Sequence, residues 1–382
     1  MNEMKKNLLP LIVFITASLS LTAFEVTFTG GARMDIPEAW ELDESDPSVP
    51  SWYSPDRRSA AELMLWAPGT WDTLDSFIES ARPQGAEGDV FVFQCWGGEA
   101  ALATWTFPGS GGSFRGWFLF VVRSGPDVRV SAIAAEEDFS ERQPFLLSVL
   151  DSYIPGENWR LTPGAVSTFL EITGEPEKEA VGVPFEDTYL SWEQSSAGNQ
   201  ASQDVIEREA LVLSAYASVP DLFYPAWERY YRLIYRDSYS RLEPLVEALQ
   251  SGPLPLNTSD PRVVSEKLLS WLQGFSYGST DRFSDLLSPS AACSSQTGDC
   301  DSLSLVLLIL MDHYGVDGLL LLSQQAHHAL TGLDVPGEGM RYTEGENSWI
   351  VAELTSNLSL GVLPERLTAV SDWFGITLLS KE

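Results

Sequence analysis

A chain of 382 residues is long for one domain, since domains commonly hold on the order of 100–200 residues, and the sequence therefore predicts two folded units. The 54 acidic residues outnumber the 23 basic ones and give a formal net charge of −31, which argues against nucleic acid or an anionic membrane surface as a partner, because both need a basic face. A hydrophobic content of 44% favours globular domains with buried cores over disorder.

The first 23 residues have the pattern of a signal peptide for export. Lys5 and Lys6 precede an apolar run over 8–21 that is too short and too interrupted for a membrane span. Small residues at Ser18, Ser20 and Ala23 offer cleavage sites. We expect an exported protein, periplasmic or extracellular, with no membrane span after signal removal; an uncleaved N-terminal anchor is the alternative.

Residues 24–155 are predicted to form an antiparallel α+β domain. A helix is expected over 71–82, where Thr70 can cap the N-terminus and apolar residues recur at helical spacing, and an amphipathic helix over 141–153 closes the domain. The predicted strands cover 24–28, 62–67, 90–96, 99–107, 116–122 and 128–134.

This domain resembles the PsbP-like fold in four features: the entry strand that ends in Pro37-Glu-Ala-Trp40, the helix Leu74–Ala81, the antiparallel strands, and the closing helix with Leu147-Ser-Val-Leu-Asp-Ser-Tyr153. The resemblance implies an α/β sandwich built on an antiparallel sheet. Members of that family are mostly accessory or binding modules without enzymatic activity, so a partner in the cell envelope is expected. A generic α+β module is the alternative.

Residues 156–201 are predicted as a connector rich in Gly, Pro, Glu and Ser, with short strands at 165–172 and 188–193. Residues 202–382 then hold a helical segment, with helices over 205–216 and 222–235, followed by a catalytic block over 263–364.

Within this block, Gly298-Asp-Cys300-Asp301 leads directly into a helix predicted over 302–313. Free backbone N–H groups and the positive end of the helix dipole favour the thiolate of a cysteine in that position. The Cys300 N–H can also help to stabilise an oxyanion. A buried structural cysteine is the alternative, but it has no need to follow a Gly-Asp turn and open a helix.

Three strands are expected after this helix, over 315–323, from 327 or 328 to 335, and over 349–355, the last carrying Glu353. Neighbouring strands place a histidine on one beside an acid on the next. His327 and His328 compete, because successive strand residues face opposite sides of a sheet.

The block resembles a transglutaminase-like domain of the papain-type superfamily. The matching segments are Leu272-Gln-Gly-Phe-Ser-Tyr277, Gly298-Asp-Cys-Asp301, His328-Ala-Leu-Thr-Gly332, Trp349-Ile-Val-Ala-Glu-Leu-Thr355 and Gly361-Val-Leu-Pro364. The resemblance implies helices packed on an antiparallel sheet, with Cys300 as nucleophile, His328 as general base and acid, and Glu353 as the carboxylate that orients the imidazole. Its H-x-x-x-G spacing selects His328 over His327. Aspartate is the more common acid in the superfamily.

Gln273 and Gln296 are candidates for a second oxyanion donor, with a structural role as the alternative for each. No cofactor is expected, and three histidines without an acidic cluster at ligand spacing make a metal site unexpected. Only three cysteines occur: Cys95 and Cys293 could pair and leave Cys300 free, or all could be unpaired.

The sequence therefore predicts a thiol enzyme that acts on an amide or peptide bond of a protein or peptide substrate. A thioester at Cys300 would be released by water or by an amine. The alternative is a catalytically silent binding or assembly module.

Overall fold

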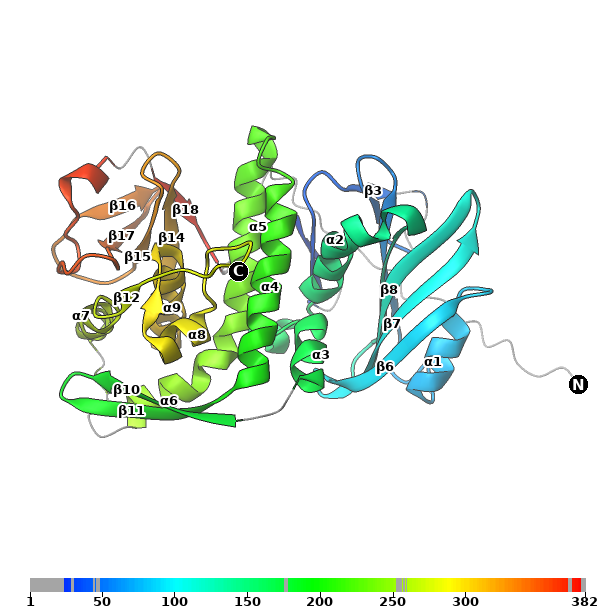
Figure 1. Cartoon of the computed structure of the whole chain (residues 1–382), viewed down its shortest axis with the longest axis horizontal. Helices are drawn as coiled ribbons and strands as arrows, with labels where there is room; N and C mark the ends of the chain where they lie inside the picture. The colour runs from blue at the N-terminus through cyan, green and yellow to red at the C-terminus, as the bar shows by residue number, and fades with distance from the viewer. Residues whose placement is uncertain are drawn as a thin grey trace, which may run out of the picture. The chain divides into compact units, whose positions relative to one another are not determined.

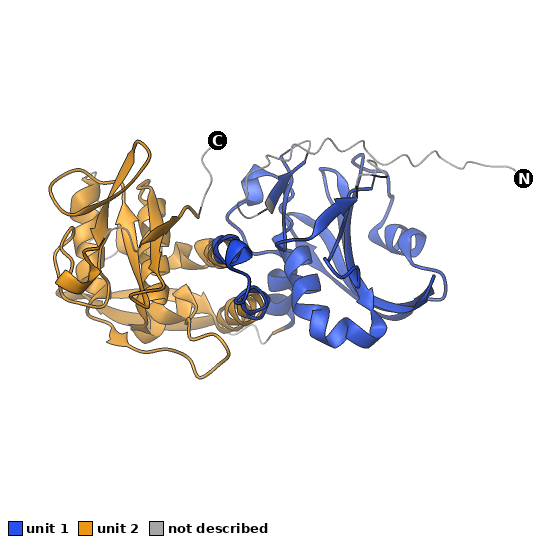
Figure 2. Ribbon diagram, turned by 90° about the horizontal axis from the view of Figure 1, so that it is seen from above, with its two compact units in different colours: residues 1–173, 211–229 blue, residues 174–210, 230–382 orange. Residues whose placement is uncertain are grey.

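The computed structural model describes residues 24–28, 31–43, 45, 49–174, 178–251, 256, 258, 260–369 and 373–378 (Figure 1). The predicted signal peptide, 1–23, lies outside them. The chain forms two compact units, one of residues 1–173 and 211–229 and the other of residues 174–210 and 230–382 (Figure 2). Helices and antiparallel sheets occur in both, which confirms the predicted α+β class.

The first unit is built on a seven-stranded antiparallel sheet with the strand order β3-β4-β5-β9-β8-β7-β6. The strands are β3 (Glu41–Asp43), β4 (Ser51–Tyr53), β5 (Ser59–Trp66), β6 (Glu87–Cys95), β7 (Gly98–Gly109), β8 (Gly112–Val122) and β9 (Asp127–Ala135). The β-rich pattern of the sequence is thus confirmed, and consecutive hairpins join β6 to β9.

Helices cover both faces of this sheet. On one face, α2 (Phe139–Ser152), α3 (Ala165–Thr173) and the small β1–β2 pair (Phe24–Thr27 and Arg33–Ile36) enclose one apolar core. On the other face, α1 (Leu74–Ala81) packs Phe77 between Trp66 and Phe120. Thr73 rather than Thr70 caps α1, because Thr73 and Ser76 form a reciprocal capping box.

The segment expected to be a connector is ordered structure. The predicted strand at 165–172 is wrong, because these residues form α3. Asp151 of α2 accepts hydrogen bonds from the backbone N–H groups of Val166 and Ser167 at 2.9 and 3.0 Å, and this supplies the cap that the local sequence lacks. The second predicted strand is confirmed as β11 (Thr188–Ser195), which pairs with β10 (Lys178–Phe185).

The second unit holds a five-stranded antiparallel sheet with the order β16-β17-β15-β14-β18. Its strands are β14 (Gly318–Ser323), β15 (His328–Leu333), β16 (Arg341–Glu344), β17 (Asn347–Ala352) and β18 (Phe374–Ile376). The helix α9 (Cys300–His313) packs on β14 and β15. A separate apolar cluster contains Leu321 of β14 and Leu330 of β15 together with Trp373.

The remaining elements are α4 (Ser196–Ser214), α5 (Pro220–Tyr239), α6 (Glu243–Ser251), α7 (Pro261–Leu272), α8 (Pro289–Ser295), the parallel pair β12 (Ser276–Tyr277) and β13 (Thr297–Gly298), and the short 3-10 helices η1 (Glu136–Asp138), η2 (Glu157–Trp159), η3 (Ser240–Leu242) and η4 (Glu365–Leu367). Of the helices in the described part of the chain, none has the length and apolarity needed to cross a membrane.

Candidate active site

Cys300 is the first residue of α9, two residues before the helix start expected from the sequence. Asp299 is the N-cap: its backbone is extended, and its carboxylate accepts a hydrogen bond from the Ser302 N–H at 2.8 Å. Gly298 pairs with Tyr277 across the short parallel pair β12–β13. The Gly-Asp turn and the cap therefore fix Cys300 in the first turn of the helix, as the motif predicts.

The Cys300 side chain is buried, with 8% of the residue exposed. Its Sγ donates to Asp301 Oδ1 at 3.2 Å, and Asp301 Oδ2 accepts a hydrogen bond from the Tyr231 hydroxyl at 2.5 Å. Tyr231 lies on α5 and is itself buried. The nucleophile candidate is thus held by a carboxylate that a second helix positions.

This surrounding raises the pKa of the Cys300 thiol. Burial is the largest cause and the Asp301 carboxylate the next, while a hydrogen bond from the Ala329 backbone lowers the pKa by less. Burial and Asp301 also raise the pKa of Asp299, to about 6. Burial and the adjacent carboxylate thus oppose the thiolate that the helix N-terminus is expected to favour.

His328 and Glu353 are in direct contact. His328 Nε2 lies 2.7 Å from Glu353 Oε2, and the two side chains are 9% and 0% exposed. Glu353 Oε1 accepts from the Thr355 N–H at 2.7 Å and from its hydroxyl at 2.6 Å. Burial raises the pKa of Glu353, but the hydrogen bonds from His328 and Thr355 outweigh it and lower the pKa overall.

The strand register explains this contact. Thr331 of β15 pairs with Ala352 of β17, so Glu353, one residue beyond the strand, lies diagonally across from His328 at the start of β15. His327 precedes the strand in a turn, with φ of +47° and an exposed side chain. The structure therefore places His328, and not His327, beside the acid.

The sulfur lies at the same end of β15, because the Ala329 backbone hydrogen-bonds to it. Further along, the Thr331 hydroxyl donates to the Ser304 carbonyl of α9 at 3.5 Å, so Thr331 faces the helix. His328 instead lies near Trp373, with ring centroids 6.4 Å apart. Among the hydrogen bonds of the described residues, the thiol donates to Asp301 and not to His328.

The two oxyanion candidates differ in their surroundings. Gln273 Nε2 donates to the carbonyls of Glu353 and Leu358 at 2.8 and 2.9 Å, so both amide hydrogens are used to hold the loop after β17. This arrangement supports the structural alternative for Gln273. Gln296 ends α8 with φ of +51° and is half-buried, four positions before Cys300.

The sequence interpretation missed two contributors to this site. Asp301 directly follows Cys300 in the Gly-Asp-Cys-Asp segment, and a carboxylate next to a thiol is a local signal that opposes thiolate formation. Tyr231 carries no local signal, since it stands 70 positions before its partner Asp301. All three cysteines are buried and none is in a disulfide, so Cys95 and Cys293 do not pair.

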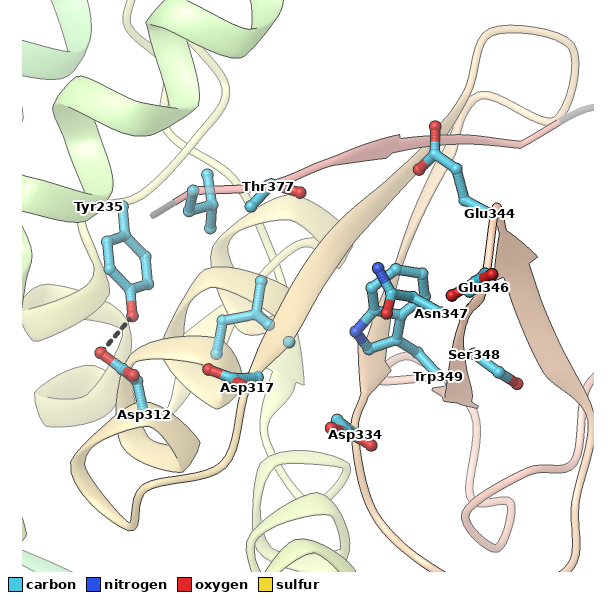
Figure 3. Close-up of a pocket in the computed structure, with 13 residues that line it drawn as sticks. Tyr235, Asp312, Asp317, Asp334, Glu344, Glu346, Asn347, Ser348, Trp349 and Thr377 are labelled. Atoms are coloured by element: carbon cyan, nitrogen blue, oxygen red, sulfur yellow. Dashed lines mark hydrogen bonds between the residues drawn. The ribbon is translucent and has the colours of Figure 1, made fainter. Parts of the chain in front are cut away.

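A cavity of about 610 Å³ lies elsewhere in the second unit, where α9 ends and β14 begins (Figure 3). Asp312, Asp317, Asp334, Glu344 and Glu346 line it together with Trp349. Cys300, His328 and Glu353 do not line this cavity. In the part of the chain that the structure describes, no group of three or more His, Cys, Asp or Glu side chains is placed to hold a metal ion.

No family model matches the sequence, and no curated protein matches it. Solved structures with local similarity include the cyanobacterial PsbP protein CyanoP from Synechocystis sp. PCC 6803, at 10% identity and a TM-score of 0.27 over 40% of this chain and 97% of that one. Protein PA94 of Pseudomonas aeruginosa, of unknown function, has 15% identity and a TM-score of 0.25 over 33% and 92%. LpqN of Mycobacterium tuberculosis, involved in cell envelope biogenesis, has 13% identity and a TM-score of 0.22 over 32% and 82%. Likenesses this low carry no argument about fold or function, and both family resemblances stay predictions.

Proposed function

We propose that this chain is an exported, transglutaminase-like thiol enzyme that transfers or hydrolyses the acyl group of an amide through a thioester at Cys300. The observation that carries the proposal is the buried His328–Glu353 contact of 2.7 Å, made at the end of the strand whose next residue, Ala329, lowers the pKa of the Cys300 thiol through its backbone. Nucleophile, base and orienting acid then come from α9, β15 and the end of β17, in the order of the transglutaminase-like motifs.

The contact also supports a separate role for each nitrogen of the imidazole. Because Nε2 donates to the Glu353 carboxylate, the neutral ring has its free lone pair on Nδ1, which is the nitrogen that must accept the thiol proton. In the proposed step the sulfur turns from Asp301 toward His328, the Sγ–H proton passes to Nδ1, and the sulfur forms a bond to the carbonyl carbon.

The C–N bond of the amide then breaks, and the leaving amine takes the proton back from His328. Water or a second amine attacks the thioester, loses its proton to His328, and releases the acid or a new amide with the thiol restored. The Cys300 N–H at the helix N-terminus is the proposed oxyanion donor. The substrate class is a protein or peptide, and the place of action is the periplasm or the cell exterior, with the PsbP-like unit as a docking module for an envelope partner.

A second candidate is a catalytically silent binding module. The specific observation in its favour is that Cys300 is buried and donates a hydrogen bond to Asp301, which favours the thiol form of the sulfur. The two functions differ in one consequence: only the enzyme forms a covalent acyl intermediate at Cys300.

Hydroxylamine separates these candidates, because it captures a thioester as a hydroxamate whether the natural acceptor is water or an amine. The full chain is incubated with a mixture of peptides and hydroxylamine, and hydroxamates are counted by mass spectrometry. We expect product from the wild-type protein, a fall of roughly 10²–10⁴-fold for His328→Ala, and a fall at least as large for Cys300→Ser.

Cys293→Ala is the matched control, since this thiol is also buried in the second unit but lies on α8. It must retain the wild-type rate. Equal hydroxamate formation by wild type and Cys300→Ser, or none by either, would contradict the enzyme and leave the binding module.

A further inference from the structure

Two tyrosine–aspartate hydrogen bonds join α5 to α9. Tyr231 binds Asp301 at 2.5 Å at the start of α9, and Tyr235 binds Asp312 at 3.1 Å near its end. The second pair is drawn in Figure 3 beside the acidic cavity. The two pairs have the same chemistry and helices, but only the first touches a thiol.

Both oxygens of Asp301 are occupied. Oδ2 accepts from Tyr231, and Oδ1 accepts from the Cys300 thiol at 3.2 Å. An oxygen that accepts from the thiol can do so only while the sulfur keeps its proton, since a thiolate has none to donate. The Asp301 carboxylate therefore opposes formation of the nucleophile that the reaction needs.

Titratable groups on several elements surround the Asp301 carboxylate and affect its pKa. Burial is the largest cause and raises the pKa of Asp301 above its ordinary value, as does Asp285, whereas the hydrogen bonds from Tyr231 and the Cys300 thiol and the nearby His328 of β15 lower it by less. Asp299 at the helix cap, Tyr230 on α5 and Tyr277 of β12 also lie within electrostatic reach of Asp301. Of these groups, only His328 can bring a positive charge.

We infer that Asp301, fixed by Tyr231, is a positioning residue that holds the Cys300 thiol protonated and turned away from His328 in the resting enzyme. The inference deepens the proposed function by assigning its regulation. Neutralising Asp301, or drawing the thiol proton toward His328 Nδ1, frees the sulfur. No other group has to change, because Tyr231 remains a donor at neutral pH: burial raises its pKa well above the ordinary value.

The test is the pH profile of Cys300 alkylation by iodoacetamide, measured on the intact chain and assigned by peptide mass spectrometry. Asp301→Asn keeps the shape and can still accept from the thiol, but it removes the negative charge. We expect the midpoint of the profile to fall by at least about one pH unit. At a fixed pH below both midpoints, lowering the thiol pKa by one unit gives about ten times more thiolate, but each thiolate is less nucleophilic. Labelling is therefore expected to be roughly threefold faster for each unit by which the thiol pKa falls.

Tyr231→Phe is the second variant, and it leaves the carboxylate in place. Losing the hydroxyl removes the hydrogen bond that fixes Asp301 Oδ2, so the carboxylate is held less firmly against the thiol, and a smaller shift in the same direction is expected. Tyr235→Phe and Asp312→Asn are the matched controls on the same two helices, and their profiles should coincide with wild type.

An unchanged midpoint in both Asp301→Asn and Tyr231→Phe would overturn the inference. So would an equal shift in Tyr235→Phe, which would assign the effect to loosened helix packing. Iodoacetamide needs no substrate, so these profiles can shift as expected even when no hydroxamate forms. Failure of the role inferred for Asp301 and failure of the proposed enzymatic activity are therefore separate outcomes.

Discussion

Replacing Glu353 by glutamine tests the contact that carries the proposed function. The wild-type carboxylate accepts from His328 on one oxygen and twice from Thr355 on the other, in a position that is 1% exposed. A glutamine offers one acceptor and one donor group. With its oxygen toward His328, its NH₂ faces the Thr355 N–H; with its NH₂ toward His328, the imidazole must shift its proton to Nδ1.

The first orientation leaves the buried Thr355 N–H without an acceptor, which costs about 1–3 kcal/mol. The second keeps these hydrogen bonds but places a proton on Nδ1, the nitrogen that must accept the thiol proton. Urea unfolding followed by tryptophan fluorescence measures this loss. Glu346→Gln is the matched control, because Glu346 is exposed on the β16–β17 turn of the same sheet, and we expect a change within about 0.5 kcal/mol for it.

The same carboxylate gives a pH dependence with a defined sign. Since the folded protein lowers the pKa of Glu353 from 4.5, its stabilising contribution is present above that pH and is lost as the pH falls through the lowered folded value. Glu353→Gln should therefore flatten the acid limb of the stability curve. A variant as stable as wild type at neutral pH, with an unchanged acid limb, would refute the reasoning.

Two further substitutions test the surroundings of the site. Asp299→Asn retains a good helix cap but removes a carboxyl whose pKa is raised to about 6, so the wild-type group costs stability as the pH rises from 3.8 through 6. The variant should be more stable than wild type by up to about 3 kcal/mol near pH 8 but by little near pH 4. An equal gain at both pH values, measured by urea unfolding, would be evidence against this. Gln273→Ala should lower the free energy of unfolding by about 1–3 kcal/mol, because the carbonyls of Glu353 and Leu358 lose their donors. Gln296→Gly, at a position with positive φ, should leave stability unchanged or raise it by up to about 1 kcal/mol. The reverse order of stability in thermal unfolding would contradict these placements.

Local patterns were sufficient to predict most elements of the fold. The alternation of apolar residues located the long strands β5 to β9, and the Gly-Asp-Cys motif located the start of α9 to within two residues. The short apolar run at 165–172 was misassigned because such a run fits a strand or a helix equally well. Its helix depends on Asp151, a cap from another element that the segment itself does not contain.

The site could be predicted only in part, because some of its contacts also come from distant segments of the chain. The His328–Glu353 contact follows from strand register and neighbouring motifs, which are encoded within a short stretch of chain. The state of Cys300 depends on burial and on the bond from Tyr231 to Asp301, which connects distant segments. The backbone of α9 favours the thiolate, whereas burial and Asp301 raise the pKa of the thiol, and burial cannot be read from the local motif.

A crystal structure of the chain with a peptide aldehyde bound to Cys300 tests the central claim most directly. The account predicts a thiohemiacetal at Cys300 Sγ, His328 Nδ1 within about 2.6–3.2 Å of the adduct, and Nε2 still bonded to Glu353. An adduct whose sulfur stays more than about 6 Å from the His328 ring, or a Cys300 that remains unmodified and bonded to Asp301, would contradict it.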